Sequence, residues 1–173
     1  KTVSIGLTKS QSSSKPIKIN DIDTSNNPRI DLKDSELNRV LGGGIVPGSL
    51  VLIGGEPGIG KSTLLLQISL LLNIKVLYVT GEESQQQIKR RADRINSNSE
   101  LCFILNETNV EKIITEINYI NPELVIVDSV QTLQTDAIDN SPGSVSQIKE
   151  STSHFLKYAK KTNLPFVLSL IHI

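Results

Sequence analysis

The stretch from residue 49 to residue 63 constrains this chain more than any other. A short apolar run, residues 49–53, opens into a glycine-rich loop, and an aliphatic helical pattern follows. Gly55, Gly60, Lys61 and Ser62 fit the spacing G-x-x-x-x-G-K-[ST] in the strand–loop–helix context that this pattern requires. A chance match to all four fixed positions in a chain of this size is on the order of one per cent. The stretch therefore predicts a phosphate-binding loop, although a glycine-rich turn without a ligand is the plain alternative.

The residue types in this loop suit a nucleoside triphosphate, with ATP and Mg²⁺ as the expected ligands. Glycines allow backbone N–H groups to approach phosphate oxygens, and the start of the following helix adds partial positive charge. Lys61 is expected to reach the β and γ phosphates and to assist catalysis, and the Ser62 hydroxyl to hold Mg²⁺. The candidate nucleotide-binding residues are Gly55, Glu56, Pro57, Gly58, Ile59, Gly60, Lys61, Ser62 and Thr63.

Composition bounds the remaining classes. The chain has 173 residues, enough for one core, and its 18 basic residues balance 18 acidic ones. This balance excludes a strong overall field for nucleic acid, so any such contact needs a local patch. Nothing resembles a signal peptide or a membrane span of about 20 residues, so we expect a cytoplasmic protein without a membrane partner. The single cysteine, Cys102, lies in an apolar run and is expected to be a buried small hydrophobe rather than a reactive thiol.

Apolar runs and helical patterns alternate along the chain. Residues 1–28 are rich in Ser, Lys, Asn and Asp and are interpreted as a flexible linker, followed by a folded core at 29–173. Helical patterns are expected at 34–41, 64–72, 84–95, 110–119 and 145–161. Four runs after the loop, 75–80, 101–105, 124–128 and 165–168, are expected as strands covered on both faces. The alternation predicts an α/β fold: a mostly parallel sheet with helices on both faces.

Three acids follow predicted strands and should meet the loop at the carboxyl edge of that sheet. Asp128 ends the run 124–128 and is expected to bind Mg²⁺, with a loop-capping role as the alternative. Because Ser129 and not an acid follows Asp128, the group that activates water must come from elsewhere. Glu82 is our first candidate and Glu83 the second. These acids and Ser84 could instead only favour the start of the next helix.

Basic and histidine residues give weaker signals. Helical positions 89, 90, 91 and 94 form one predicted basic face, and Lys149, Lys157, Lys160 and Lys161 form another. Such faces are more often solvated than bound to DNA. His154 and His172 lack metal-ligand spacing. Residues 131–144 form a long connection of the kind that carries function or moves.

Several segments together resemble the bacterial RadA (Sms) family of DNA repair proteins. The segment 36–50 runs into the loop in the family's manner, and similar segments follow in the same order at 78–84, 91–94, 124–131 and 141–147. The resemblance covers about residues 17–168 and is far more specific than the loop alone.

This resemblance implies a RecA-like P-loop ATPase core, with DNA-dependent ATP hydrolysis driving branch migration on recombination intermediates that contain single-stranded DNA. It further implies a homo-oligomeric ring, a hexamer in the full protein, and a recombinase of the RecA type as partner in homologous recombination. In similar proteins residues 55–62 bind ATP, the acid at the position of Glu82 activates water, and the loop at 142–147 lies toward the DNA.

The chain also departs from the family pattern. Zinc is expected only in a four-cysteine N-terminal module that is absent here. Residues 169–173 do not fit the family's Gly-His segment or the Lys-Asn-Arg-Phe-Gly motif beyond it, so we expect a truncated or frame-slipped end and do not assign His172 as a phosphate sensor. This fragment is then expected to be inactive alone. The alternative function is a non-motor, nucleotide-switched assembly module of RecA/KaiC type that binds protein partners and not DNA, and a fragment that only binds nucleotide is a third.

Overall fold

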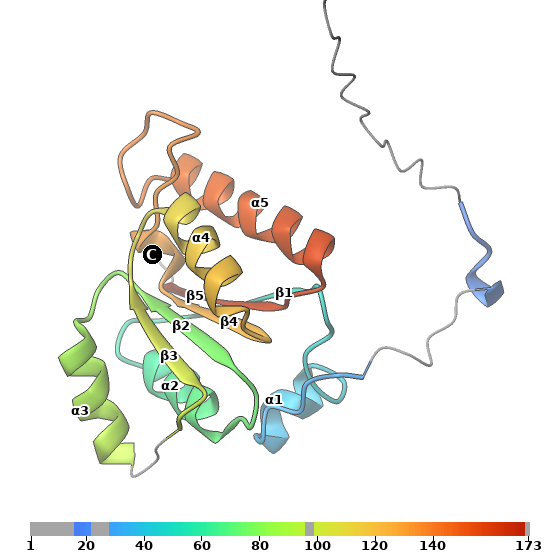
Figure 1. The fold of residues 1–173 in the computed structure, drawn as a ribbon, viewed down its shortest axis with the longest axis horizontal. Coiled ribbons are helices and arrows are strands. Elements are labelled where there is room, and N and C mark those ends of the chain that lie inside the picture. Colours follow the sequence, from blue (N-terminus) through green and yellow to red (C-terminus); the bar gives the residue numbers. More distant parts are fainter. Residues whose placement is uncertain (1–15, 22–27, 96–98, 172–173) are drawn as a thin grey trace, which may run out of the picture.

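A computed structural model describes residues 16–21, 28–95 and 99–171. The sheet has five strands in the order β1-β5-β4-β2-β3, and every neighbouring pair is parallel. This arrangement confirms the predicted α/β class (Figure 1). The strands are β1 (Leu50–Gly55), β2 (Val76–Thr80), β3 (Cys102–Asn106), β4 (Leu124–Asp128) and β5 (Phe166–Ile171). Most of the predicted linker, at 1–15 and 22–27, and His172 lie outside the described residues.

Helices cover both faces of the sheet. Figure 1 shows α4 and α5 on one face and α2 and α3 on the other. The α-helices are α1 (Ser35–Val40), α2 (Lys61–Leu71), α3 (Gln85–Ile95), α4 (Val110–Ile120) and α5 (Val145–Thr162). Two short 3₁₀ helices, η1 (Ile19–Asp21) and η2 (Val130–Thr132), complete the described elements.

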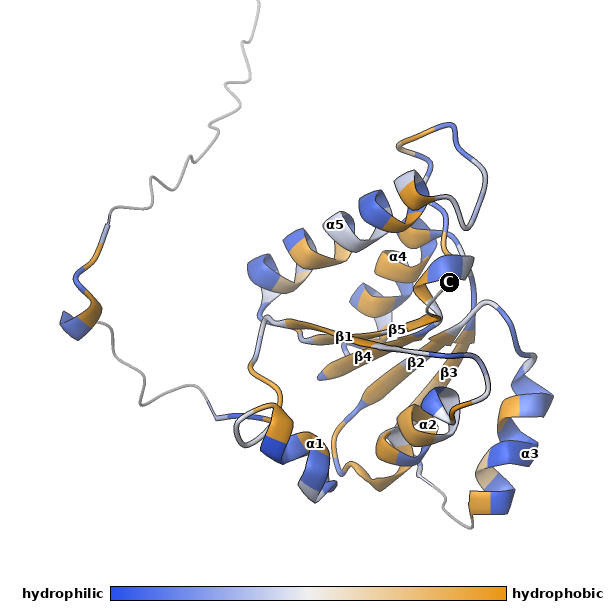
Figure 2. Ribbon diagram, turned by 180° about the vertical axis from the view of Figure 1, so that it is seen from behind, coloured by the Kyte–Doolittle hydropathy of each residue, from blue (hydrophilic) through white to orange (hydrophobic). Residues whose placement is uncertain are grey.

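Side-chain alternation along the central strands builds two hydrophobic clusters on opposite faces of the sheet. Leu77 and Val79 of β2 pack with α4, α5 and η2. Val76 and Tyr78 of the same strand pack with α2 and α3. Figure 2 shows the hydrophobic residues concentrated on the strands, while α3 and α5 carry many hydrophilic residues. The uninterrupted apolar runs thus reflect burial on both faces.

Three details differ from the sequence prediction. The strand at 101–105 is covered incompletely, since it forms the edge strand β3 and Phe103 is 38% exposed. Helix α2 begins at Lys61 and not near residue 64, so the loop lysine and serine belong to its first turn. Strand β5 continues to Ile171, three residues past the predicted run, because its whole length pairs with β1.

The long connection between β4 and α5 is anchored at its middle. Gln147 of α5 is buried, and its Oε1 accepts a hydrogen bond from the Thr135 N–H at 2.9 Å. Its Nε2 donates to the carbonyls of Thr135, Ile138 and Asn140 at 3.3, 3.2 and 2.9 Å. Within the expected DNA-facing segment 142–147, Gln147 therefore points into the protein. Pro142 and Gly143 are exposed.

A helix that spans a bilayer must be both long and apolar. Among residues 16–21, 28–95 and 99–171, no helix meets both requirements for spanning a membrane.

Candidate nucleotide-binding site

The glycine-rich loop joins β1 to α2 in a conformation that leaves its inner side open. Gly58 and Gly60 have φ values of 76° and 101°, in the left-handed region that favours glycine. A Cβ added at either glycine would meet nothing within 4 Å. Gly60 is the N-cap of α2 and makes no side-chain cap hydrogen bond, so no capping side chain covers the first N–H groups of the helix. The loop thus offers backbone donors to an anion.

Lys61 closes across this loop. Its Nζ donates to the carbonyls of Gly55 and Glu56 at 2.6 and 2.7 Å. These bonds use two of the three donors of the ammonium group. The positive charge is therefore held over the loop, at the start of α2.

The loop forms one wall of a cavity of about 340 Å³. The opposite wall comes from the carboxyl ends of neighbouring strands, as the parallel topology requires. The cavity is lined by Pro57, Gly58, Gly60, Lys61, Ser62, Thr63, Glu82, Arg91, Asp128, Ser169 and Ile171. Three of the predicted nucleotide-binding residues do not line this cavity. Gly55 and Glu56 accept hydrogen bonds from Lys61 through their backbone carbonyls, and Ile59 is 70% exposed.

Asp128 lies at the end of β4, directly across from Thr80 of β2. The hydroxyl of buried Tyr78 donates a hydrogen bond to Asp128 Oδ2 at 2.8 Å. Burial, together with the negative charge of Asp128, raises the pKa of Tyr78 far above its usual range. The hydroxyl therefore stays protonated and the carboxylate is the acceptor.

Glu82 is held beside Asp128 by Ser129, the residue that follows Asp128. Ser129 Oγ donates to Glu82 Oε1 at 2.7 Å, and the peptide bond between Asp128 and Ser129 is cis. Gly81 permits this approach, since a Cβ at that position would lie 2.4 Å from Thr132 Oγ1. Close packing at Gly81 thus brings Glu82 to the cavity.

Glu83 has a different environment. Its carboxylate forms an ion pair with Arg91 of α3, and its carbonyl accepts from Asn106 Nδ2 at 2.6 Å. Ser84 and Gln87 form a reciprocal cap, in which Ser84 N–H donates to Gln87 Oε1 at 2.8 Å. The cap of α3 is therefore made by Ser84. The Glu82 carboxylate accepts from Ser129 instead, and the Glu83 carboxylate pairs with Arg91.

The predicted basic face of α3 is wrong at one position, Arg91. Its side chain is only 20% exposed and lines the cavity, whereas Arg90 and Arg94 are exposed. The helical period explains the difference, because Arg91 lies on the same face as buried Ile88 and Ala92. Neither Arg91 nor Tyr78 was predicted as a site residue. A tyrosine hydroxyl inside a buried strand needs a partner, which is the signal that could have found Tyr78.

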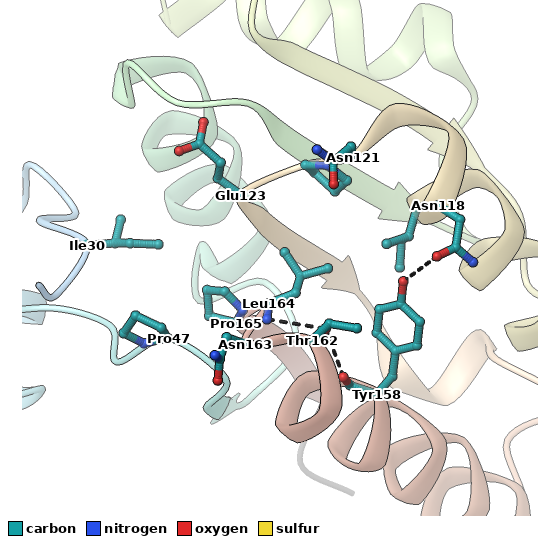
Figure 3. Close-up of a pocket in the computed structure, with 12 residues that line it drawn as sticks. Ile30, Pro47, Asn118, Asn121, Glu123, Tyr158, Thr162, Asn163, Leu164 and Pro165 are labelled. Carbon is teal, nitrogen blue, oxygen red and sulfur yellow. Dashed lines mark hydrogen bonds between the residues drawn. The ribbon is translucent and has the colours of Figure 1, made fainter. Parts of the chain in front are cut away.

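A second cavity, of about 460 Å³, lies at the opposite edge of the sheet, where the strands begin (Figure 3). Pro47 precedes β1 there, Glu123 precedes β4 and Pro165 precedes β5. Tyr158 donates to Asn118 Oδ1 at 2.7 Å in its wall. The described lining residues include no lysine or arginine. This larger cavity therefore lacks the cations and glycine loop that phosphates require, and we assign the nucleotide site to the smaller one.

The lining of the loop cavity fits a nucleotide with Mg²⁺. Magnesium is usually held by one or two protein oxygens together with phosphates and water. Ser62 and Asp128 offer such oxygens on the same cavity. Within the described part of the chain, no cluster of three or more His, Cys, Asp or Glu could hold a metal ion alone. A metal held by Ser62 and Asp128 would also take oxygens from the phosphates and from water.

A parallel sheet whose first strand enters this loop, with acids at the ends of two other strands, defines a P-loop nucleotide-binding domain. The chain belongs to the AAA domain family, which it matches over residues 14–172.

Curated relatives agree with the resemblance seen in the sequence. The chain is 52% identical to "DNA repair protein RadA" of Halalkalibacterium halodurans, over 87% of this chain and 34% of the relative. It is 50% identical to the protein of that name in Bacillus subtilis, over 91% of this chain and 35% of the relative. For the Streptococcus pneumoniae protein the identity is 48%, over 87% and 36%. The chain thus spans about a third of the length of these relatives.

Proposed function

We propose that this chain is the ATP-binding and ATP-hydrolysing core of a DNA repair protein. The observation that carries the proposal is that Lys61, Ser62, Glu82 and Asp128, drawn from three separate segments, line one cavity beside a phosphate-binding loop. The relatives named "DNA repair protein RadA" support the biological setting. We place the start of the folded core near residue 29, and the bridge between Ile30 and Ile45 supports this boundary.

Each residue has a role that follows from its position. Lys61 and the backbone N–H groups of the loop bind the phosphates, while Ser62 and Asp128 hold Mg²⁺, with Asp128 acting through water. When bound, Mg²⁺ neutralises charge on the phosphate oxygens. Glu82 orients or deprotonates the attacking water, because it lines the cavity beside Asp128.

Glu83 is the weaker candidate for this base. Its carboxylate is paired with Arg91, and Glu83 is not among the residues that line the cavity. We therefore assign Glu83 a supporting role, in which it holds α3 against the end of β2.

The DNA-level activity rests on the family resemblance. ATP turnover would drive branch migration on recombination intermediates with single-stranded DNA, in a cytoplasmic homo-oligomeric ring that works with a recombinase of the RecA type. The alternative is a nucleotide-switched assembly module that binds protein partners. Both functions use the same ATP site, so a site test and a DNA test are both needed.

The site test compares two substitutions in the full-length protein. Glu82→Gln keeps the shape of the side chain and should retain ATP binding while turnover falls at least about 100-fold. Lys61→Ala should weaken nucleotide binding itself. Undiminished hydrolysis in Glu82→Gln would refute the base, and unchanged nucleotide affinity in Lys61→Ala would refute the loop as the phosphate site.

The DNA test measures ATP turnover with and without single-stranded DNA over a range of salt concentrations. A DNA motor should be stimulated, with a DNA affinity that falls steeply as salt rises. Turnover that ignores DNA, with no measurable DNA binding at low salt, would favour the assembly module.

A further inference from the structure

We infer that Tyr78 is a positioning residue for the metal: its hydroxyl holds the Asp128 carboxylate in the orientation in which that group would hold Mg²⁺ through water. The inference deepens the proposed function and rests on it, because it assigns Asp128 to the metal. Tyr78 touches neither nucleotide nor metal in this scheme and acts only through Asp128.

The first support is the placement of the ring. Tyr78 is fully buried in the cluster between the sheet and α2, where it packs with residues such as Leu65 and Ile88. It pairs in register with Ile126, two residues before the position where Thr80 faces Asp128. Side chains two residues apart share a face of a strand, so Tyr78 and Asp128 project to the same side of the sheet. A rigid aromatic ring thus spans the two-residue offset and places a single polar atom beside the acid.

The second support is the set of contacts that this hydroxyl makes. It donates to Asp128 Oδ2 at 2.8 Å and lies 3.5 Å from the backbone carbonyl oxygen of Ser62. Because a hydroxyl has one proton to donate, the shorter contact is the hydrogen bond and the longer one a close approach. The hydroxyl therefore sits between the two residues whose side-chain oxygens we assign to Mg²⁺. Oδ2 of Asp128 accepts this bond, and the Asp128 side chain also lines the cavity.

The third support is the general behaviour of metal sites. Partners that hydrogen-bond to a ligating carboxylate fix its orientation, and their loss commonly lowers metal affinity by 10- to 100-fold. The alternative is that the hydrogen bond to Asp128 serves only the stability of the fold, because a buried tyrosine hydroxyl needs a hydrogen-bond partner. The two roles differ in one measurable respect: a purely structural hydroxyl leaves the magnesium dependence of nucleotide binding unchanged.

The experiment uses Tyr78→Phe in the full-length protein, since phenylalanine keeps the packing and removes only the donor. Binding of a fluorescent ADP analogue is titrated in EDTA and then over a range of Mg²⁺ concentrations. We expect an affinity in EDTA within about twofold of wild type and a Mg²⁺ midpoint raised about tenfold. The matched control is Tyr158→Phe, which also removes one tyrosine hydrogen bond, at the opposite edge of the sheet (Figure 3). It should change neither value.

Asp128→Asn separates the two levels of inference. If Asp128→Asn shifts the Mg²⁺ midpoint and Tyr78→Phe does not, the role of Tyr78 is overturned and the proposed metal site stands. If Asp128→Asn also has no effect, the metal assignment itself fails. A Tyr78→Phe protein that loses nucleotide affinity in EDTA assigns the hydroxyl to the fold and also overturns the inference. In the double variant, Tyr78→Phe should add no further shift to that of Asp128→Asn, and full additivity would contradict a role through Asp128.

Discussion

The hydroxyl of Ser129 donates a hydrogen bond to Oε1 of Glu82 across 2.7 Å. The residue that follows the acid of β4 thereby holds the acid that follows β2. This contact links the ends of two neighbouring strands, because β2 and β4 are paired in register up to Thr80 and Asp128.

Ser129→Ala should slow ATP turnover about tenfold, since a hydrogen bond to a charged group is worth about 1.5–3 kcal/mol and part of it serves to position Glu82. Nucleotide affinity should stay within twofold of wild type. The measurement is steady-state hydrolysis beside direct binding in the full-length protein. Ser35→Ala, on exposed helix α1, is the control for the same chemical change. Equal turnover in both variants would show that Ser129 does not position the base.

Gly81→Ala should destabilise the domain by roughly 2 kcal/mol, because the new Cβ overlaps packed atoms. That Cβ would lie 2.4 Å from Thr132 Oγ1 and 2.7 Å from Thr108 Cγ2. Gly54→Ala is the matched control, because a Cβ there meets nothing within 4 Å. Its free energy of unfolding should stay within about 0.5 kcal/mol of wild type. Urea unfolding of both variants gives the comparison, and similar losses would argue against close packing at Gly81.

Arg91→Ala should lower the free energy of unfolding by about 2–3 kcal/mol, since it leaves the Glu83 carboxylate without its partner in a partly buried place. Arg90→Ala, the exposed neighbour on α3, should cost less than about 0.5 kcal/mol. A double-mutant cycle with Glu83→Ala should give a coupling energy above about 1 kcal/mol. Additive effects would mean that the ion pair contributes nothing to stability.

Cys102 should be a slow thiol in the folded chain. It is half-buried, and burial raises the pKa of its thiol to about 11. Since the thiolate is the reactive form, alkylation by iodoacetamide at pH 8 should be roughly 100-fold slower than in urea-unfolded protein. Cys102 is the only cysteine of the 173 residues, so the rate in this chain reports on it alone. Equal rates in the folded and unfolded states would identify an accessible thiol.

Much of the fold could be predicted because local patterns reflect burial directly. The apolar run 124–128 coincides with β4, and the run 75–80 contains β2 within one residue. Both lie inside the sheet, where continuous burial leaves little ambiguity. The prediction weakened at the edge strand β3, since nothing local in 101–105 says that a neighbour is missing on one side.

The candidate site divides in the same way. Lys61 and Ser62 could be identified because the spacing of the loop is a local pattern. The partners of Glu82 and Glu83 could not, because both acids follow β2 and differ only in long-range contacts, with Ser129 for Glu82 and with α3 and β3 for Glu83. The sequence pattern places Arg91 in a solvated basic run, whereas in α3 its side chain faces the cavity and pairs with Glu83. Tyr78 could not be identified for a related reason, because the sequence pattern does not distinguish an aromatic residue of an apolar run from any other core residue.

The single amide of Gln147 has a mechanical consequence for the loop before α5. By bonding the carbonyls of Thr135, Ile138 and Asn140, it ties the first turn of α5 to the middle of the loop. These bonds lie between the loop tip at Pro142 and Gly143 and the end of β4 at Asp128, so a change in the tip should leave Asp128 in place. Evolution, or an engineer, can redesign the tip as a contact surface while the chemistry at the other end of the connection stays in place.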